Sequence, residues 1–310
     1  MNRNRFKGKN YQVQAMNQQA FQKKKILKRQ LDVFPQSLRR QILKKIKTRS
    51  WKSLEIDPDM TKTFLKASIY EFQSIKTIKK IHFCHRITPS ELMKLGSSLK
   101  SLIAVQEITL YFASLYKVSA EGIYHLCQGL KRLRFLKELH IIFWIFSHMA
   151  KAFFYFLGES LKTLISLETV QLNFQESSAR LLMQFPEWDL PLPKNKEGPQ
   201  NILKSLKNHL KLQKLGLYFS HNQTADDVRL ENFSQALKKL TLLREIDLNF
   251  TRNSEIGDAG LLNLSEALER LLSLKFLRLR FNSVSEAVIR QAKERMNRIQ
   301  QLETLKIESV

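Results

Sequence analysis

Apolar residues recur along the chain in one pattern, which has leucine or another aliphatic residue at positions 1, 4, 7 and 9 and phenylalanine most often at position 11. Leu133, Leu136, Leu139, Ile141 and Phe143 form one of the clearest copies. Eight segments fit the pattern, closing at residues 85, 112, 143, 174, 219, 250, 281 and 309, and six of them close on phenylalanine. A period near 30 residues is typical of a solenoid, in which each repeat buries its apolar face against its neighbours.

Within each copy, the spacing of the apolar residues changes from that of a strand to that of a helix. Ile246, Leu248 and Phe250 alternate with polar residues, which predicts a strand with one buried face. Leu261 and Leu264 follow at helical spacing, and helix-start residues stand between the two segments at 257–260. Units of this kind place parallel strands on the concave face of an arc and helices on its convex face.

One interval between copies is 45 residues long, against 27 to 31 for the others. Four prolines and a glycine lie within its residues 185–200, which predicts an inserted loop. Insertions in a solenoid project from one rim and often contact a partner. Trp188 in this loop either packs on the adjacent helix or is an exposed anchor for a partner.

The net charge of +24 is concentrated at the start of the chain. Residues 1–52 contain 16 Lys and Arg against one acidic residue, Asp32. Such an arm is typical of a protein that binds a polyanion. The polyanion is RNA, an acidic protein surface or anionic lipid. The alternative is a solvated tail without a partner. The residues that we expect to contact RNA or another polyanion are Arg3, Arg5, Lys23, Lys24, Lys25, Lys28, Arg29, Arg39, Arg40, Lys44 and Lys45.

The second half of this arm has the pattern of a basic amphipathic helix. Ser37 is a suitable N-cap, and Leu38, Ile42 and Ile46 follow at helical spacing, with Trp51 and Leu54 extending the apolar face. A helix here would cover the open end of the solenoid core. A membrane-surface helix or an RNA-binding helix is the alternative. The sequence thus divides into an arm with a capping helix at 1–55 and a solenoid at 56–310.

The pattern Leu-x-x-Leu-x-Leu-x-Phe, followed by Ile-Gly-Asp-Ala-Gly-Leu at 256–261, resembles the leucine-rich repeat of ribonuclease-inhibitor type. The resemblance covers about residues 65–310, and the closing phenylalanine is similar to that of the leucine-rich-repeat families of ciliates. It implies an α/β leucine-rich-repeat solenoid of about eight strand–helix repeats, with a parallel sheet on the concave face and a role in binding. The family usually has a small polar residue directly after the strand, and here only Ser220, Thr251 and Asn282 conform.

Composition and motifs limit the compartment and the chemistry. The hydrophobic content of 43% supports a packed core, and two cysteines suit a reducing intracellular compartment, either cytoplasm or mitochondrial matrix. The acid-free start of the arm is one feature of a mitochondrial presequence, whereas the apolar stretch Leu139–Leu157 is interrupted by polar residues and predicts no transmembrane segment. His82, Cys84 and His85 do not make up a four-ligand zinc site. We therefore expect no enzyme, cofactor, metal or small-molecule substrate.

The strand positions that face away from the core predict a mixed aromatic and polar concave surface. Its centre is amphipathic and its C-terminal end is basic, which suits a protein or peptide partner better than duplex nucleic acid. The candidate protein-binding residues, in the concave face and the inserted loop, are Tyr111, Ile142, Trp144, Trp188, Tyr218, Arg278 and Arg280.

A second column of basic residues follows the last helical leucine of successive repeats. Stacking would align these residues along one edge, where like charges repel and phosphates would relieve the repulsion. A solvated rim is the alternative. The candidate residues are Lys100, Lys131, Arg132, Lys162, Lys207, Lys238 and Lys239.

These features favour a non-enzymatic scaffold. Our leading hypothesis is an architectural subunit of an RNA-containing assembly, a ribosome or mitochondrial ribosome, with the arm on RNA and the concave face and inserted loop on neighbouring proteins. The alternative is a protein-binding module of a ciliary, microtubule or other large complex. A ubiquitin-ligase substrate receptor is a third hypothesis, because Phe34, Pro35, Leu38, Ile42 and Leu43 are faintly similar to an F-box.

Overall fold

The computed structural model describes residues 53–56, 79–84, 88–112, 120–145, 147–176, 200–219, 226–253 and 255–309. Apart from Leu54, all arm residues named above lie outside these ranges, as does the loop at 185–199, so the arm helix, the inserted loop and Trp188 stay predictions.

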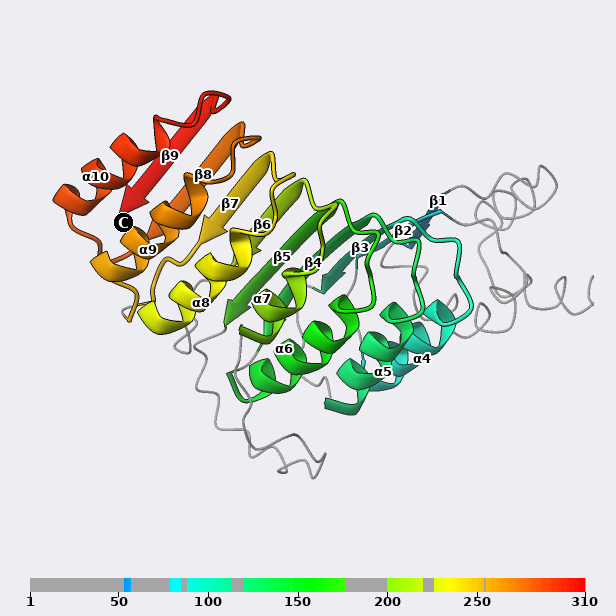
Figure 1. Cartoon of the computed structure of the whole chain (residues 1–310). Coiled ribbons are helices and arrows are strands. Elements are labelled where there is room, and N and C mark those ends of the chain that lie inside the picture. The colour runs from blue at the N-terminus through cyan, green and yellow to red at the C-terminus, as the bar shows by residue number, and fades with distance from the viewer. Residues whose placement is uncertain are drawn as a thin grey trace, which may run out of the picture.

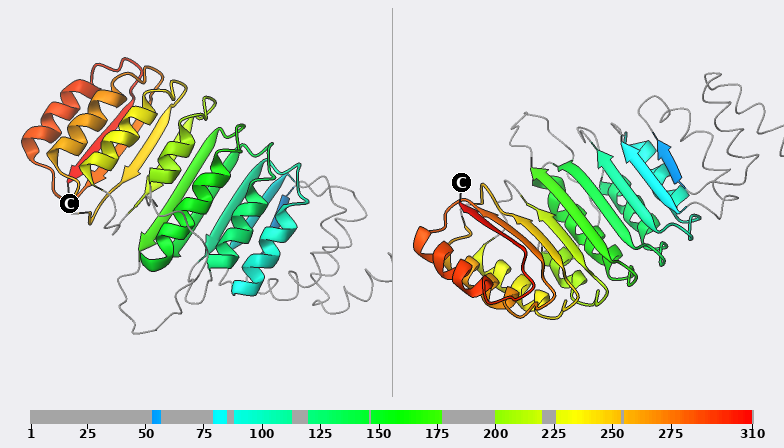
Figure 2. Two further views of the ribbon diagram at one scale, coloured as in Figure 1. Left: turned by 60° about the horizontal axis from the view of Figure 1, so that its bottom comes forward. Right: turned by 90° about the horizontal axis from the view of Figure 1, so that it is seen from above.

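The described residues contain nine strands, which form one parallel sheet whose spatial order follows chain order. The strands are β1 (Ser53–Ile56), β2 (Lys80–Cys84), β3 (Glu107–Phe112), β4 (Glu138–Ile145), β5 (Thr169–Glu176), β6 (Lys214–Tyr218), β7 (Glu245–Asn249), β8 (Phe276–Phe281) and β9 (Thr304–Ser309). The helices between them are α4 (Pro89–Leu99), α5 (Ala120–Leu130), α6 (Ser147–Leu161), α7 (Gln200–Leu206), α8 (Asp227–Leu237), α9 (Asp258–Leu268) and α10 (Glu286–Met296). These helices cover one face of the sheet, and none of the described helices lies on the other face, here called the open face (Figures 1 and 2).

The α/β class and the solenoid-like alternation of parallel strands with helices are confirmed. The eight predicted strands correspond to β2–β9, and β1 is one strand more than the sequence predicted. Leu54, expected on the apolar face of the arm helix, instead lies in β1 and pairs with Ile81 of β2. The prediction for Leu54 was wrong, because a strand of four residues contains too few alternations to be distinguished from one helical turn.

The phenylalanines that close the strands form a column inside the core. Phe174, Phe219, Phe250 and Phe281 have neighbouring ring centroids 5.7, 6.2 and 5.7 Å apart, with ring planes within 24° of parallel. Towards the N-terminus the rings tilt, and Phe153 of α6 packs with its ring centroid 4.5 Å from that of Phe143. The described part of the apolar stretch Leu139–Leu157 is divided between β4 and α6, and its residues in the core include Leu139, Ile141, Phe143, Phe153, Phe154 and Leu157. Among the described residues, no helix has the length and hydrophobicity needed to cross a bilayer.

Each described helix is joined to the next strand by a loop of seven residues, and there are seven such loops, at 100–106, 131–137, 162–168, 207–213, 238–244, 269–275 and 297–303. The third and sixth residues of a loop enter the core, as Leu133 and Leu136 do. The seventh residue donates its backbone N–H to the seventh residue of the loop before it, at 2.7 to 2.8 Å, beginning with Gln106 on Lys79. The loops are therefore held in register by the same kind of ladder that joins the strands.

At the other ends of the helices, side chains connect one repeat to the next. Asp227, the first residue of α8, accepts a hydrogen bond from the backbone N–H of Gly257 at 2.9 Å. Asp258, the first residue of α9, accepts from the backbone and side chain of Ser285 at 2.7 and 2.8 Å. Asn253 donates from Nδ2 to the carbonyl oxygens of Phe219 and Phe250 at 2.9 and 2.8 Å. In the repeat of β7, the polar side chain that bonds the backbone after the strand is therefore Asn253, which lies two residues after Thr251.

Glycine allows α4 and α5 to pack closely. A Cβ atom on Gly129 would lie 2.3 Å from the carbonyl oxygen of Gly96, and a Cβ atom on Gly96 would lie 2.2 Å from that of His125. Both contacts are with backbone, so relief requires the helices to move apart. Gly257, in contrast, would place a Cβ atom no closer than 3.7 Å to any neighbour.

We predict that Gly129→Ala lowers the free energy of unfolding by about 1–3 kcal/mol, because the overpacked contact outweighs the higher helix propensity of alanine. Gly257→Ala is the matched control, which adds a methyl group at the N-cap of α9 without a close contact and should lower the thermal midpoint less than Gly129→Ala does. Thermal unfolding followed by circular dichroism measures both. Equal midpoints for the two variants would show that the helices separate at little cost.

His209 occupies a core position that is leucine in most repeats. Its ring is 1% exposed, with Nε2 3.0 Å from the carbonyl oxygen of Leu161 and Nδ1 3.3 Å from that of Leu206. Burial lowers the pKa of His209 below its usual 6.5, although hydrogen bonds to the backbone carbonyls oppose the shift. At a pH at which His209 of the unfolded chain begins to bind a proton, the same ring in the folded protein therefore remains neutral.

Stability should decrease as the pH falls below about 6.5, because the unfolded chain then binds a proton that the folded protein resists. We predict that His209→Leu reduces this loss. The measurement is the difference in urea midpoint between about pH 7.5 and about pH 5, compared between wild type and variant. An identical difference in the two proteins would assign the pH dependence to other groups.

Candidate interaction surfaces

The strand registers align the outward-facing residues of the open face into two columns, as the sequence predicted. Register pairs connect Thr109, His140, Gln171, Gly216, Asp247 and Arg278 in one column. Register pairs connect Tyr111, Ile142, Asn173, Tyr218, Asn249 and Arg280 in the other. The candidate protein-binding residues Tyr111, Ile142, Tyr218, Arg278 and Arg280 thus share one surface.

Four side chains from β6, β7 and β8 form a polar cluster on this face, here called the open-face cluster. Its centre is Asp247, which accepts a hydrogen bond from the Tyr218 hydroxyl at 2.9 Å and one from Arg280 Nη2 at 3.0 Å. Arg278 Nη1 lies 3.6 Å from the same carboxylate, and the Arg280 guanidinium lies 5.7 Å from the centroid of the Tyr218 ring. Gly216 makes room for this cluster, because a Cβ atom there would lie 3.3 Å from the Tyr218 ring.

The cluster changes the expected electrostatics of the C-terminal end. Asp247 partly neutralises Arg278 and Arg280, so this end is less basic than the sequence indicated. Burial, followed by the hydrogen bond to Asp247, raises the pKa of Tyr218 to about 12, so its hydroxyl remains a donor at neutral pH. The sequence placed these residues in the two columns without indicating that they bind one another.

The N-terminal part of the open face is more apolar. Tyr111 and Ile142 are partly exposed neighbours on β3 and β4. Beside them, His140 Nδ1 lies 2.8 Å from Gln171 Oε1. Trp144, also a candidate protein-binding residue, lies within β4 and pairs with Gln175, because β4 and β5 run to Ile145 and Glu176.

The predicted basic column lies where expected, at the first residues of the helix-to-strand loops. Lys100, Lys131, Lys162, Lys207 and Lys238 each directly follow a helix, and cations at helix C-termini also stabilise the helix dipole. The like-charge repulsion is smaller than predicted: Lys162 pairs with Glu159, and Lys238 binds Glu266 at 3.1 Å. The hydrogen bond from Lys238 lowers the pKa of Glu266.

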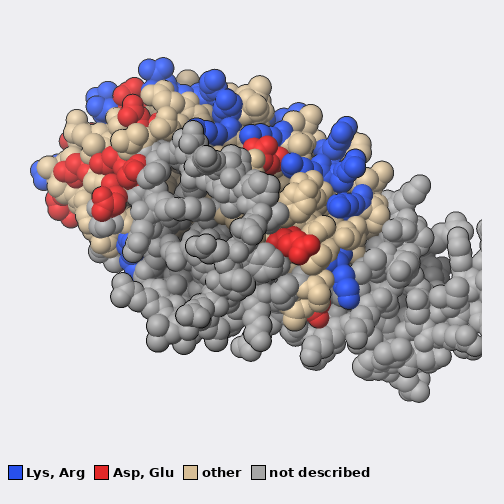
Figure 3. All heavy atoms as spheres, turned by 90° about the horizontal axis from the view of Figure 1, so that it is seen from below, with Lys and Arg blue, Asp and Glu red and all other residues tan. Residues whose placement is uncertain are grey.

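The opposite ends of the helices are acidic, with Asp227, Asp258 and Glu286 in the first turns of α8, α9 and α10. Figure 3 shows acidic side chains gathered at the end of the molecule formed by the C-terminal repeats, and Lys and Arg along one margin. The two edges of the solenoid therefore differ in charge.

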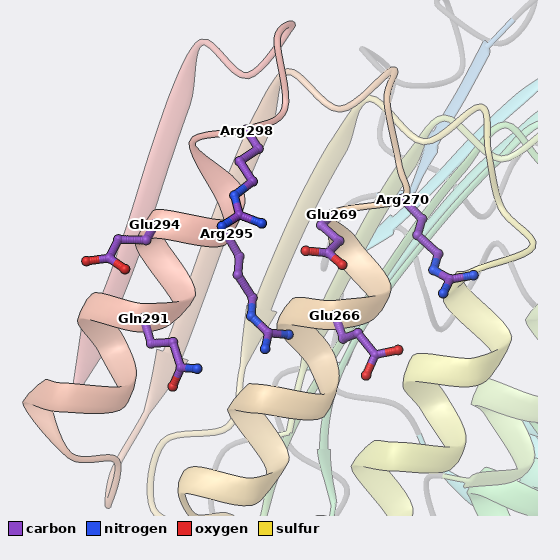
Figure 4. Close-up of a pocket in the computed structure, with 7 residues that line it drawn as sticks. All are labelled: Glu266, Glu269, Arg270, Gln291, Glu294, Arg295 and Arg298. Atoms are coloured by element: carbon purple, nitrogen blue, oxygen red, sulfur yellow. The ribbon is translucent and has the colours of Figure 1, made fainter.

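A surface groove of about 550 Å³ lies between α9 and α10 (Figure 4). Arg295 and Arg298 extend from the α10 side towards α9, which carries Glu266 and Glu269, whereas Glu294 points away from it. The full lining is Glu266, Glu269, Arg270, Gln291, Glu294, Arg295 and Arg298. Its three glutamates and three arginines balance, so the groove offers little net charge to a ligand. Within the described ranges, no group of three His, Cys, Asp or Glu side chains is arranged to hold a metal ion.

We predict that Asp247→Asn lowers the pKa of Tyr218, because the variant loses the carboxylate and leaves two arginines that favour the phenolate. In the wild type, the Tyr218 ring signals should not titrate between about pH 9 and about pH 11, whereas in the variant they should begin to shift there. Nuclear magnetic resonance of labelled tyrosine rings measures this. Asp258→Asn is the control, and unchanged Tyr218 signals in Asp247→Asn would contradict the assigned hydrogen bond.

Comparison with known proteins gives little further guidance. No family model matches the chain, and no curated protein matches it. Among solved structures, the chain is similar to a crystal structure of a protein from Bacteroides fragilis, a structural-genomics target, with 11% sequence identity and a TM-score of 0.35, over 77% of this chain and 70% of that chain. A likeness of this size carries no argument about function.

Proposed function

We propose that the protein is a leucine-rich-repeat scaffold of ribonuclease-inhibitor type that acts by binding and not by catalysis, and that its open face holds a segment of another protein. The observation that carries the proposal is the open-face cluster, Tyr218, Asp247, Arg278 and Arg280. Tyrosine and arginine are enriched among the residues that dominate protein–protein binding energy. Here they lie on the face of the parallel strands that none of the described helices covers.

The geometry of the cluster supports binding because its side chains are already held in place. Asp247 bonds Tyr218 and Arg280, and the Arg280 guanidinium lies over the tyrosine ring, so little rotamer entropy remains to be lost on association. Arg278 lies 3.6 Å from Asp247 and 5.4 Å from the centroid of the Phe276 ring, and its side chain is 32% exposed. It is thus able to bind a carboxylate of the partner, while Tyr111 and Ile142 offer apolar contacts further along the same face.

The test compares two double variants in affinity capture from the native source, with quantitative mass spectrometry. Tyr218→Ala with Arg278→Ala removes two anchors of the open face, and Tyr124→Ala with Arg290→Ala removes a tyrosine and an arginine from the helical face. A partner of the open face should be depleted about 30-fold or more with the first variant, since the loss of even one anchor residue costs about 2 kcal/mol or more. It should be retained with the second. Equal recovery with both variants would reject the open face as the binding surface.

A second candidate function is that of an architectural subunit of an RNA-containing assembly. This proposal rests on the charge of residues 1–52. The 16 basic residues of this arm against one acid favour contact with phosphates. Binding of RNA by the full chain should then weaken steeply between about 50 and 200 mM salt. Nuclease treatment during the capture described above should release the associated proteins. Salt-independent association that survives nuclease would leave the purely protein-binding scaffold as the function.

A further inference from the structure

The helix-to-strand loops expose a row of large apolar side chains. Each of six consecutive loops has one such residue at its fourth or fifth position, between the two residues that enter the core. They are Ile103, Phe135, Ile165, Leu210, Leu242 and Leu272, with exposed fractions of 50%, 62%, 65%, 61%, 49% and 69%. We call them the loop-tip residues.

Their exposure is a property of this edge and not of the surface in general. In the part of the chain that the structure describes, the other exposed large apolar residues are Tyr124 and Val228. Tyr124 is 37% exposed and lies on α5 beside Phe156, while Val228 lies at the opposite edge, in the first turn of α8. Packing does not explain the loop-tip residues, since the core positions of the same loops are already filled by other buried residues, which are leucines in most loops.

The same loops carry the positive charge of the solenoid. The seven loops contain 14 basic and 3 acidic residues, a net charge of +11. Residues 53–310 as a whole have 36 basic and 27 acidic residues, so without these loops their net charge is −2. Among the described residues, no acidic side chain pairs with Lys100, Arg132, Lys207 or Lys239.

Backbone hydrogen bonds also fix how these loops are arranged along the edge. The backbone ladder at the seventh loop residue fixes each loop against the one before it. The loops lie side by side along one edge of the sheet, the upper edge in Figure 1. With neighbouring strands about 5 Å apart, six tips span about 25 Å at the sheet and more towards the helices.

We propose that this edge docks onto an anionic phospholipid bilayer. The loop-tip residues enter the headgroup region, and the lysines and arginines between them contact lipid phosphates. Exposed aliphatic side chains combined with basic residues are the chemistry by which peripheral proteins bind anionic membranes. The repeats would stand on the bilayer with their helix C-termini towards it, leaving the open face perpendicular to the membrane and accessible.

The side chains favour a bilayer over the other polyanions. Single-stranded nucleic acid is bound by aromatic side chains that stack on bases, and five of the six tips are aliphatic. Protein interfaces concentrate apolar residues in a core depleted of charge, whereas here each tip is flanked by lysine or arginine along the row. A row of separate apolar points within a basic edge matches a bilayer, where each tip can enter between headgroups independently.

The first experiment places an environment-sensitive fluorophore on the full chain through a single reactive cysteine. Leu272→Cys and Ile165→Cys mark the tips, and Val228→Cys, 67% exposed, is the matched site at the opposite edge. All carry Cys84→Ser, and Cys127 is buried, with its thiol pKa raised to about 12, so it does not react. Vesicles of phosphatidylcholine with about one-third phosphatidylserine should blue-shift the emission at both tips and not at residue 228. The arm is the same in all three proteins, so binding through the arm alone would not produce this difference.

The second experiment changes the charge of the edge. Lys131→Glu with Lys239→Glu, in the labelled Leu272→Cys protein, should lower the partition coefficient onto these vesicles by more than tenfold, at about fivefold per basic residue lost. Arg290→Glu with Lys293→Glu makes the same charge change on α10 and should reduce partitioning much less. Emission that stays unshifted at the tips, shifts equally at residue 228, or shifts with RNA but not with vesicles would overturn the proposal.

Discussion

The hydrogen-bond ladder between parallel strands, continued by one bond into every helix-to-strand loop, is the constraint on which the other features of this protein depend. A single repeat exposes its apolar side on two flanks, and only the next repeat in register covers it. Register therefore decides whether the phenylalanine column and the leucine positions of the loops are buried. A shift of one residue along a strand would exchange core and surface residues, for instance Leu248 and Asn249. This strict alignment explains why the core remains continuous although the repeats share few polar residues.

The same alignment converts sequence positions into surfaces. A residue that recurs at one position of the repeat forms a row, whether or not the row has a function. Positions with a packing role are filled by leucine or phenylalanine, and replacing one by alanine costs about 2–5 kcal/mol. Positions without a packing role are free to vary, so an apolar residue that recurs there requires another explanation. The loop-tip residues satisfy this criterion, whereas most lysines of the edge also have a structural role at helix C-termini.

The sequence predicted the elements well because its strongest signal, the spacing of buried residues, is produced by the ladder itself. It predicted the two columns of the open face for the same reason. It missed what depends on side-chain reach between repeats. Asp247 meets Tyr218 and Arg280, which are 29 and 33 residues away, and Asn253 bonds a carbonyl group 34 residues away. The strand β1 was also missed, since it precedes β2 without a full copy of the pattern. The sequence shows that the loop-tip residues are apolar. It does not show that they are exposed while the apolar residues beside them in the same loops are buried.

The two proposed surfaces lie on different sides of each repeat, and this arrangement has a consequence for how the protein could work. The open face is formed by residues in the middle of the strands, and the loop edge by residues that precede the strands. A bilayer against the loop edge would meet every repeat at the same end, so the strands would stand roughly along the membrane normal. A partner bound across the open face would then lie beside the membrane and not beneath the protein.

Because β6, β7 and β8 supply the open-face cluster and their loops also belong to the basic edge, the two occupants would contact the same repeats. The ladder that holds these repeats in register would also fix the distance between partner and bilayer, as expected of a scaffold that positions one component relative to another.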